Sequence, residues 1–180
     1  MRKIAIISGS PNEKSRINGV INYARLKLEQ NGCDVTIIDV PSLPAEDLIH
    51  ANFNSKPILA AHTKVEEASG IIIASPVYKT TYTGVLKSYI DLLPQKGFKD
   101  KIAAAYFVGG TISNLLSIDY ALKPLLASMG VKCFGENVFA VDNQIERTES
   151  SEQKIRFQLA DELEQRIDAS ILDMITYIAH

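Results

Sequence analysis

The chain has 180 residues, 46% of them apolar and 22% charged, which is the composition of an ordinary globular domain. The chain has 19 lysines and arginines and 21 aspartates and glutamates, which gives a net charge of -2. This charge indicates neither a basic face for nucleic acid nor a strongly acidic electron-transfer surface. No segment approaches the ~20 consecutive apolar residues of a membrane span. We therefore expect one cytoplasmic domain, residues 1–180, with no nucleic-acid partner and no membrane partner.

The two cysteines, Cys33 and Cys133, lie far apart in the sequence and belong to no CxxC motif. Disulfide frameworks and zinc sites are typically marked by closely spaced cysteines. We expect two reduced thiols in the core and no metal site.

The sequence alternates short runs rich in isoleucine and valine with longer segments of helical period. Strands are predicted at residues 3–8, 34–40, 70–75, 101–108 and 131–141. Helices are predicted at residues 18–30, 57–69, 85–93 and 113–129. Residues 41–55 are predicted to form a long connection with room for one helical turn.

The C-terminal segment is predicted to be one long helix that begins at Ser150. Ser150 and Gln153 have the spacing of a capping box, which favours a helix start. Apolar residues then recur at helical spacing, at Ile155, Leu159, Leu163, Ile167, Ile171, Met174 and Ile178.

Strands that alternate with helices over the whole length indicate a parallel sheet covered by helices on both faces. Five such units in a chain of this size fit the flavodoxin-like α/β fold, a three-layer α/β/α sandwich with a five-stranded parallel sheet of order 2-1-3-4-5. Ligands of this fold bind outside the carboxyl ends of strands 1, 3 and 4. The sequence is least generic at these three strand ends.

The first strand is followed by Ser-Gly-Ser-Pro-Asn-Glu-Lys-Ser-Arg-Ile-Asn, which ends where a helix begins. The free N–H groups and the positive dipole end of a helix start attract an anion. Ser8, Ser10, Ser15 and Asn18 add hydroxyl and amide donors, and Arg16 adds charge. These residues suit a phosphomonoester, because the glycine motifs of dinucleotide and triphosphate sites are absent. The alternative is an ordinary turn in which Ser15 caps the helix.

The third strand ends in a loop that carries two tyrosines. Pro76 takes the chain out of the sheet because it has no N–H, and Val77, Tyr78, Lys79 and Tyr82 follow it. Aromatic rings at such a place are suited to packing against a flat ring system. The alternative is a pair of half-exposed tyrosines that cover the core.

The fourth strand ends in Gly109, Gly110 and Thr111. Glycine lets the backbone approach a ligand closely because no Cβ intervenes. A plain tight turn is the alternative.

Together these residues resemble the NADPH-dependent FMN reductase family, and within it the reductases of two-component alkanesulfonate monooxygenase systems. The resemblance extends from Lys3 to about Gln144. It is carried by Gly9-Ser10-Pro11, Ser15-Arg16, Pro76-Val77-Tyr78-Lys79, Tyr82, Gly84, Leu92-Leu93-Pro94, Gly109-Gly110-Thr111 and Asp119-Tyr120-Ala121-Leu122-Lys123-Pro124.

The resemblance implies that Ser10, Ser15 and Arg16 hold the phosphate of FMN. It places residues 76–78 and 109–111 beside the isoalloxazine. Ile17 stands where the family often has a hydroxyl residue, so Asn18 or the backbone would have to compensate.

The activity implied by the resemblance is hydride transfer from NADPH to FMN, with reduced flavin supplied to a flavin-dependent monooxygenase of sulfonate metabolism. This reaction needs no strong acid or base from the protein, because the cofactors carry the chemistry. Two alternatives stay open: a quinone, azo-dye or chromate reductase that retains its FMN, and a flavodoxin-like electron carrier without nucleotide turnover. The preference for NADPH over NADH also stays open.

The predicted helix 113–129 has more apolar surface than one sheet face covers. Its first apolar stripe is Leu115, Ile118, Leu122, Leu125 and Met129, and its second is Leu116, Tyr120 and Ala127. We therefore expect a homo-oligomer, and the resemblance implies a tetramer built as a dimer of dimers.

Pro124 leaves the carbonyl of Tyr120 without its helical partner, because proline has no N–H to donate. A helix with that gap kinks or takes in an extra residue as a π-bulge. In the family that the chain resembles, this run is associated with a π-helix at the subunit interface, where the tyrosine lies near the flavin. We hypothesise that Tyr120 belongs to the catalytic site and that the bulge keeps FMN exchangeable. The alternative is that Tyr120 only packs in an interface.

Overall fold

The computed structural model describes residues 2–149 and 155–179, and the predicted capping box of Ser150 and Gln153 lies outside them. The strands are β1 (Arg2–Ser8), β2 (Cys33–Asp39), β3 (Gly70–Pro76), β4 (Ile102–Gly109), β5 (Cys133–Phe134), β6 (Val138–Val141), β7 (Ile145–Glu149) and β8 (Ile155–Leu159). The α-helices are α1 (Ile17–Gln30), α2 (Ala45–Ile49), α3 (Lys56–Glu67), α4 (Gly84–Ile90), α5 (Lys123–Ser128) and α6 (Asp161–Ile178).

The main sheet is parallel and has the order β2-β1-β3-β4-β5, with β6 also paired to β4. In register, Ile4 of β1 lies between Val35 of β2 and Gly70 of β3. The predicted flavodoxin-like order is therefore confirmed. It brings the carboxyl ends of β1, β3 and β4 to one edge of the sheet.

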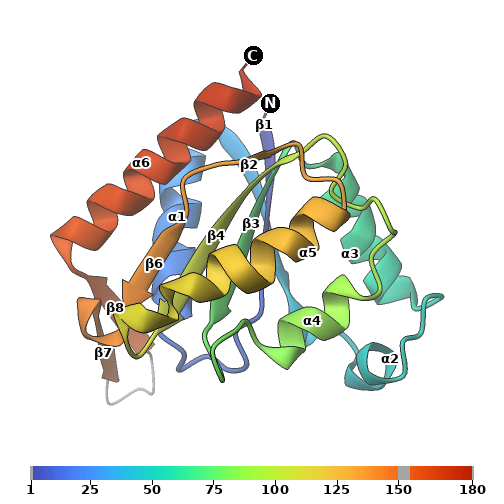
Figure 1. Ribbon diagram of the computed structural model, residues 1–180, viewed down its shortest axis with the longest axis horizontal. Helices are drawn as coiled ribbons and strands as arrows, with labels where there is room; N and C mark the ends of the chain where they lie inside the picture. The colour runs from blue at the N-terminus through green and yellow to red at the C-terminus, as the bar shows by residue number, and fades with distance from the viewer. Residues whose placement is uncertain (1, 150–154, 180) are drawn as a thin grey trace.

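Helices cover both faces of the sheet (Figure 1), and a hydrophobic core lies on each face. Ile71 and Ile73 of β3 pack in the core under α3, α4 and α5, whereas Ile72 packs in the core under α1 and α6. Successive side chains of a strand point to opposite faces, so a strand buried on both faces is apolar at every position. This explains why the central strands could be recognised as continuous apolar runs.

The predicted fifth strand is divided into two short pieces. Ile102 pairs with Cys133 of β5, and Tyr106 pairs with Val138 of β6. Between them, the side-chain carbonyl of Asn137 accepts a hydrogen bond from the N–H of Ala105 at 2.9 Å. A side chain thus takes the place of a backbone partner, which keeps β4 satisfied across the interruption.

The prediction of one helix from Ser150 onward is wrong in its first part. Residues 155–159 form β8, which is antiparallel to β7, and the helix begins only at Asp161. Ile155 and Leu159 are four residues apart, a spacing that suits one helix face and equally one face of a strand. Phe157 lies midway between them, which is the period of two that marks a strand.

The predicted helix 113–129 is interrupted before Pro124. Residues 112–115 form a 3₁₀ turn, Ile118–Leu122 form a π-helix, and α5 follows. Of the two predicted outcomes, a kink or a π-bulge, the structure shows the π-helix, with Tyr120 at its centre. Ile118 and Leu122 of the first apolar stripe are buried, whereas Leu116 and Tyr120 of the second are 58% and 79% exposed.

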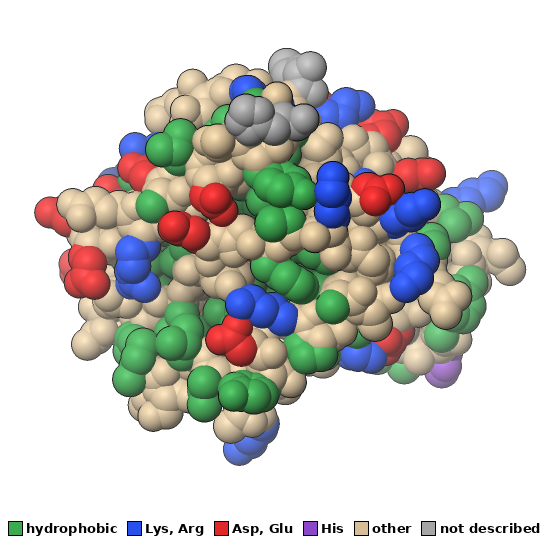
Figure 2. Space-filling view, turned by 45° about the horizontal axis from the view of Figure 1, so that its top comes forward, with side chains coloured by type: hydrophobic (Ala, Val, Ile, Leu, Met, Phe, Trp, Pro, Cys, Tyr) green, Lys and Arg blue, Asp and Glu red, His purple; other side chains and the backbone are tan. Residues whose placement is uncertain are grey.

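Charged side chains of both signs are interspersed on the face shown in Figure 2.

Cys33 and Cys133 are free thiols in β2 and β5. Within residues 2–149 and 155–179, no helix has the length and apolar character needed to cross a bilayer.

Candidate functional site

The loops after β1 and β3 are joined by a buried hydrogen-bond network. The hydroxyl of Thr83 donates to the carbonyl of Gly9 at 2.8 Å and accepts from the N–H of Leu86 at 3.1 Å. The hydroxyl of Ser75 accepts from the N–H of Thr83 at 3.1 Å. A Cβ on Gly9 would lie 2.6 Å from the Cβ of Leu86, so this close approach requires glycine. The network fixes the first loop against the end of β3.

A cavity of about 260 Å³ lies where this first loop meets the ends of β3 and β4 and the start of β7. We call it the cationic cavity, because Lys14, Arg16 and Arg147 oppose the single carboxylate of Asp142. Its lining residues are Asn12, Lys14, Ser15, Arg16, Pro76, Val77, Tyr78, Val108, Gly109, Gly110, Asp142 and Arg147. The structure therefore brings together seven residues predicted from the three strand ends: Ser15, Arg16, Pro76, Val77, Tyr78, Gly109 and Gly110.

The start of α1 borders the cationic cavity. Arg16 is the residue before the helix, and among the described residues no side chain caps this helix start. The alternative interpretation required Ser15 to cap the helix, and Ser15 does not do so. The N–H groups of Asn18 and Gly19 in the first turn already donate to the carbonyls of Ser15 and Arg16, at 3.1 and 3.0 Å. The positive end of the helix dipole and the charge of Arg16 still favour an anion at this place.

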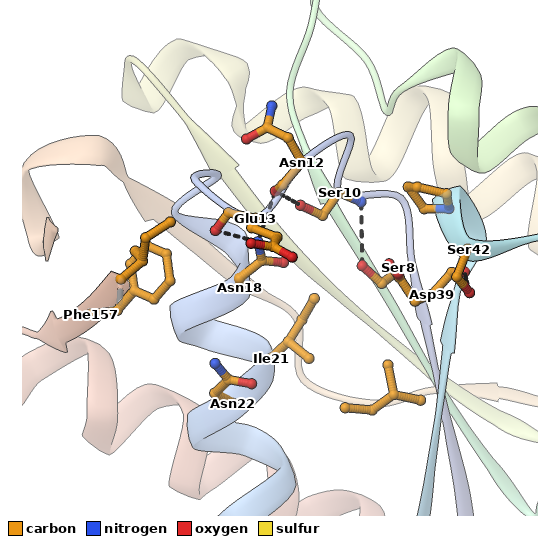
Figure 3. Close-up of a pocket in the computed structure, with 13 residues that line it drawn as sticks. Ser8, Ser10, Asn12, Glu13, Asn18, Ile21, Asn22, Asp39, Ser42 and Phe157 are labelled. Atoms are coloured by element: carbon orange, nitrogen blue, oxygen red, sulfur yellow. Dashed lines mark hydrogen bonds between the residues drawn. The ribbon is translucent and has the colours of Figure 1, made fainter. Parts of the chain in front are cut away.

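A second cavity of about 700 Å³ lies on the other side of the first loop, toward β2 (Figure 3). We call it the acidic cavity, because Glu13 and Asp39 are its charged residues. It is lined by Ser8, Ser10, Asn12, Glu13, Asn18, Ile21, Asn22, Ile37, Asp39, Pro41, Ser42, Ile155 and Phe157. Burial, together with the charge of Glu13, raises the pKa of Asp39. An anion would be repelled here.

Three predicted phosphate ligands, Ser8, Ser10 and Asn18, line the acidic cavity and not the cationic one. The hydroxyl of Ser10 donates to the carbonyl of Asn12 at 2.9 Å (Figure 3). The amide of Asn18 donates to the carbonyls of Asn12 at 2.9 Å and Glu13 at 3.1 Å. These bonds hold the first loop in shape. Contact between these three side chains and a phosphate stays a prediction.

The two glycines at the end of β4, Gly109 and Gly110, have different surroundings. A Cβ on Gly109 would lie 2.8 Å from Cζ of Phe139, so Gly109 is needed for packing. A Cβ on Gly110 would meet only Oδ2 of Asp142, at 3.9 Å. Gly110 thus faces the open cationic cavity, as expected of a backbone that a ligand approaches closely.

Three further predicted residues line neither cavity. Lys79 and Thr111 are exposed, and Tyr82 packs partly buried against the core under α3, α4 and α5. Lys79 has a φ of 50°, in a turn that is closed by a bridge between Tyr78 and Thr81. Their contact with a ligand stays a prediction.

Tyr120 lies apart from the cationic cavity within one chain. It lines a third cavity of about 500 Å³, together with Thr80 and Thr81 of the β3 loop and with Ser113, Asn114, Leu116, Ser117 and Ala121. The tyrosine is therefore close in space to the loop that carries Tyr78 and Lys79. A second chain packed on this surface would lie beside that loop.

The sequence interpretation missed Lys14 and Arg147, which supply two of the three positive charges. Lys14 lies inside the predicted loop and could have been included for its charge alone. Arg147 lies in β7, a segment for which no element was predicted from the sequence, and β8 was predicted to be part of a helix. No local pattern relates residue 147 to the end of β1, so only the tertiary structure reveals it.

Residues 2–146 match a protein family whose model is described as NADPH-dependent FMN reductase. That stretch includes every site residue predicted from the sequence. The chain belongs to this family.

Individual relatives agree with the family assignment. The FMN reductase (NADPH) of Pseudomonas putida is 35% identical over 168 residues, which cover 93% of this chain and 84% of that protein. The FMN reductase (NADPH) of Escherichia coli strain K12 is 37% identical over 145 residues, or 79% of this chain and 75% of that protein. An apo structure of an NADH:FMN oxidoreductase has a TM-score of 0.85 and 28% identity, and it covers 98% of this chain and 90% of its own.

Membership of the FMN reductase family makes this chain an oxidoreductase whose cofactors are FMN and NADPH, as the sequence resemblance predicted. The lining of the cationic cavity combines positive charges, which suit a phosphate, with the open backbone of Gly110. The family match ends at residue 146. Arg147, β8 and α6 therefore lie beyond it.

Proposed function

We propose that the cationic cavity is the FMN site. Ser15 and Arg16 bind the phosphate at the uncapped start of α1, and residues 76–78 and 109–110 lie against the isoalloxazine. The observation that carries this proposal is the charge of the two cavities beside the first loop. Among the described residues, one is lined by three cations and one carboxylate, and the other by two carboxylates and no lysine or arginine.

The protein's own residues bind and orient in this proposal. When bound, FMN supplies the centre that accepts hydride from NADPH. Tyr78, half exposed at the mouth of the cavity, offers a ring against which a flat ligand can pack. The buried network of Ser75 and Thr83 holds the loops in place, so that binding does not have to order them.

Steady-state oxidation of NADPH with increasing free FMN tests the proposed activity. We expect turnover that saturates in FMN, because flavin is a substrate that leaves the protein after reduction. Turnover that depends on an added quinone or azo dye and is indifferent to free FMN would support the FMN-retaining reductase. An absence of NADPH oxidation would support the electron carrier.

We further propose that the reduced flavin is delivered to a flavin-dependent monooxygenase, of the kind that sulfonate metabolism uses. This rests on the sequence resemblance. A coupled assay, with such a monooxygenase as the only acceptor of reduced FMN, tests it.

The surface around the π-helix is proposed to be the contact between copies of the chain. Its exposed apolar side chains are Ile112, Leu115, Leu116 and Tyr120. A homo-oligomer, a tetramer by family resemblance, would cover them and would place Tyr120 of one chain near the flavin of another. Light scattering at micromolar concentration tests this, and a strictly monomeric species contradicts it.

A further inference from the structure

The β7–β8 hairpin contacts the first loop on the side of the cationic cavity. The Nη1 of Arg147 donates to the carbonyl of Lys14 at 2.7 Å, and the Nε of Arg16 donates to the carbonyl of Ile145 at 3.0 Å. Lys14 also forms an ion pair with Glu149 at 3.2 Å. Residues from a hairpin late in the chain thus form one wall of a cavity that starts at β1.

Strand alternation explains which side chains of β7 reach the loop. Ile145, Arg147 and Glu149 lie on one face of the strand, because successive side chains point to opposite faces. Ile145 is buried in the core under α1, and Arg147 and Glu149 contact Lys14. On β8, Phe157 is opposite Arg147, and a Cβ on Gly19 of α1 would lie 2.6 Å from that of Phe157. The hairpin is therefore seated on the start of α1.

We infer that Arg147 is a second phosphate-binding arginine of the flavin site. This inference rests on the proposed FMN site, and it adds a residue beyond the end of the family match at residue 146. Arg147 lines the same cavity as Ser15 and Arg16. A guanidinium has five N–H donors in a planar fork, so its bond to Lys14 does not exhaust its capacity for a phosphate.

The charge of the cavity supports this role. A phosphomonoester carries nearly two negative charges at neutral pH, and Asp142 adds one more on the opposite wall. Arg16 alone would not balance these charges. Lys14 is already paired with Glu149, so Arg147 is the cation that adds to Arg16, and a hydrogen bond to the loop backbone holds it in place.

Equilibrium binding of FMN and riboflavin to the flavin-free full chain, followed by flavin fluorescence, tests the inference. We expect Arg147→Ala to weaken FMN binding about tenfold or more, the range for a charge-assisted hydrogen bond, and to leave riboflavin binding unchanged. Arg147→Lys keeps the charge and loses the planar fork, so its FMN affinity should lie between the two. Arg156→Ala is the matched control. Arg156 pairs with Thr148 on the other face of the same hairpin and should change neither affinity.

Two outcomes overturn the inference. One is an FMN affinity for Arg147→Ala within about twofold of the parent while Ser15→Ala weakens FMN alone, which leaves the proposed FMN site intact. The other is an equal loss of FMN and riboflavin affinity, which means that Arg147 only seats the hairpin. If Ser15→Ala, Arg16→Ala and Arg147→Ala all spare FMN binding, the proposed phosphate site itself is wrong. Should Arg147→Ala fail to fold, the comparison of Arg147→Lys with the parent decides by the same criteria.

Discussion

Arg16 and Arg147 donate hydrogen bonds in opposite directions across one contact between the first loop and the β7–β8 hairpin. Arg16 reaches from the loop to the carbonyl of Ile145, and Arg147 reaches from the hairpin to the carbonyl of Lys14. Each arginine therefore holds the other's segment. Because both also line the cationic cavity, the shape of that cavity depends on the hairpin as well as on the loop.

Ser15→Ala and Arg16→Ala should separate phosphate binding from folding. Ser15→Ala removes one donor to the phosphate, so FMN should bind about tenfold or more weakly while riboflavin binding and the melting temperature stay unchanged. Arg16→Ala should weaken FMN similarly and also lower the melting temperature, because the carbonyl of Ile145 loses its partner. Flavin titrations and thermal unfolding measure both effects. A Ser15→Ala variant that loses affinity for riboflavin and FMN alike would contradict the assignment.

Alanine at the two glycines at the end of β4 should give opposite phenotypes. Gly109→Ala places a Cβ 2.8 Å from Cζ of Phe139, and such overpacking costs about 1–3 kcal/mol of stability. Gly110→Ala meets no close neighbour in the protein, so stability should hold while both FMN and riboflavin bind more weakly. Denaturant unfolding and flavin titration of the two variants distinguish them. Equal stability of Gly109→Ala and the parent would argue against the close packing of Gly109 on Phe139.

Deletion of Tyr120 tests whether the π-helix keeps FMN exchangeable. The deletion removes the extra residue of Ile118–Leu122 and should let a regular α-helix form. We expect the purified variant to retain yellow FMN and to lose steady-state transfer to free flavin, while Tyr120→Phe stays close to the parent. A colourless deletion variant with normal turnover would contradict the hypothesis. A deletion that merely dissociates the oligomer would favour the packing interpretation.

The stability of the protein should depend on pH through the protonation of His62. Burial lowers the pKa of His62 below its ordinary value of 6.5. Below that value the unfolded chain binds a proton that the folded state takes up less readily, so stability falls as the pH drops through and below 6.5. His62→Gln should reduce this loss. Melting temperatures of parent and variant between about pH 7.5 and pH 5.5 measure it, and identical pH profiles would exclude His62 as a source.

The local sequence determines most of the fold. The central strands were predictable because burial on both faces leaves a continuous apolar run such as Gly-Ile-Ile-Ile-Ala-Ser of β3. An interruption at Tyr120 was predictable because Pro124 has no N–H. The carbonyl of Tyr120, four residues earlier, therefore loses its helical hydrogen bond. The β7–β8 hairpin was not predictable, because the spacing of Ile155 and Leu159 fits both a helix and a strand. What distinguishes the two is a tertiary contact, the close packing of Phe157 on Gly19 of α1.

The residues of the candidate site also fall into two groups, those predictable from the local sequence and those that depend on tertiary packing. Gly110 directly follows β4, and Ser15 and Arg16 belong to the loop that follows β1. Parallel topology brings these strand ends together whatever the details of packing. Ser8, Ser10 and Asn18 belong to the same loop, but whether a side chain faces one cavity or the other depends on the bonds within the loop. Arg147 reaches the site because its hairpin packs on a loop that lies more than a hundred residues earlier in the sequence.

A crystal structure of the protein with FMN tests the central claim most directly. The quantity that decides is the position of the phosphorus atom relative to the first loop. We predict that it lies in the cationic cavity, with phosphate oxygens within hydrogen-bond distance of Ser15 and Arg16. A phosphate in the acidic cavity, against Asp39 and Asn22, would contradict the assignment of the flavin site.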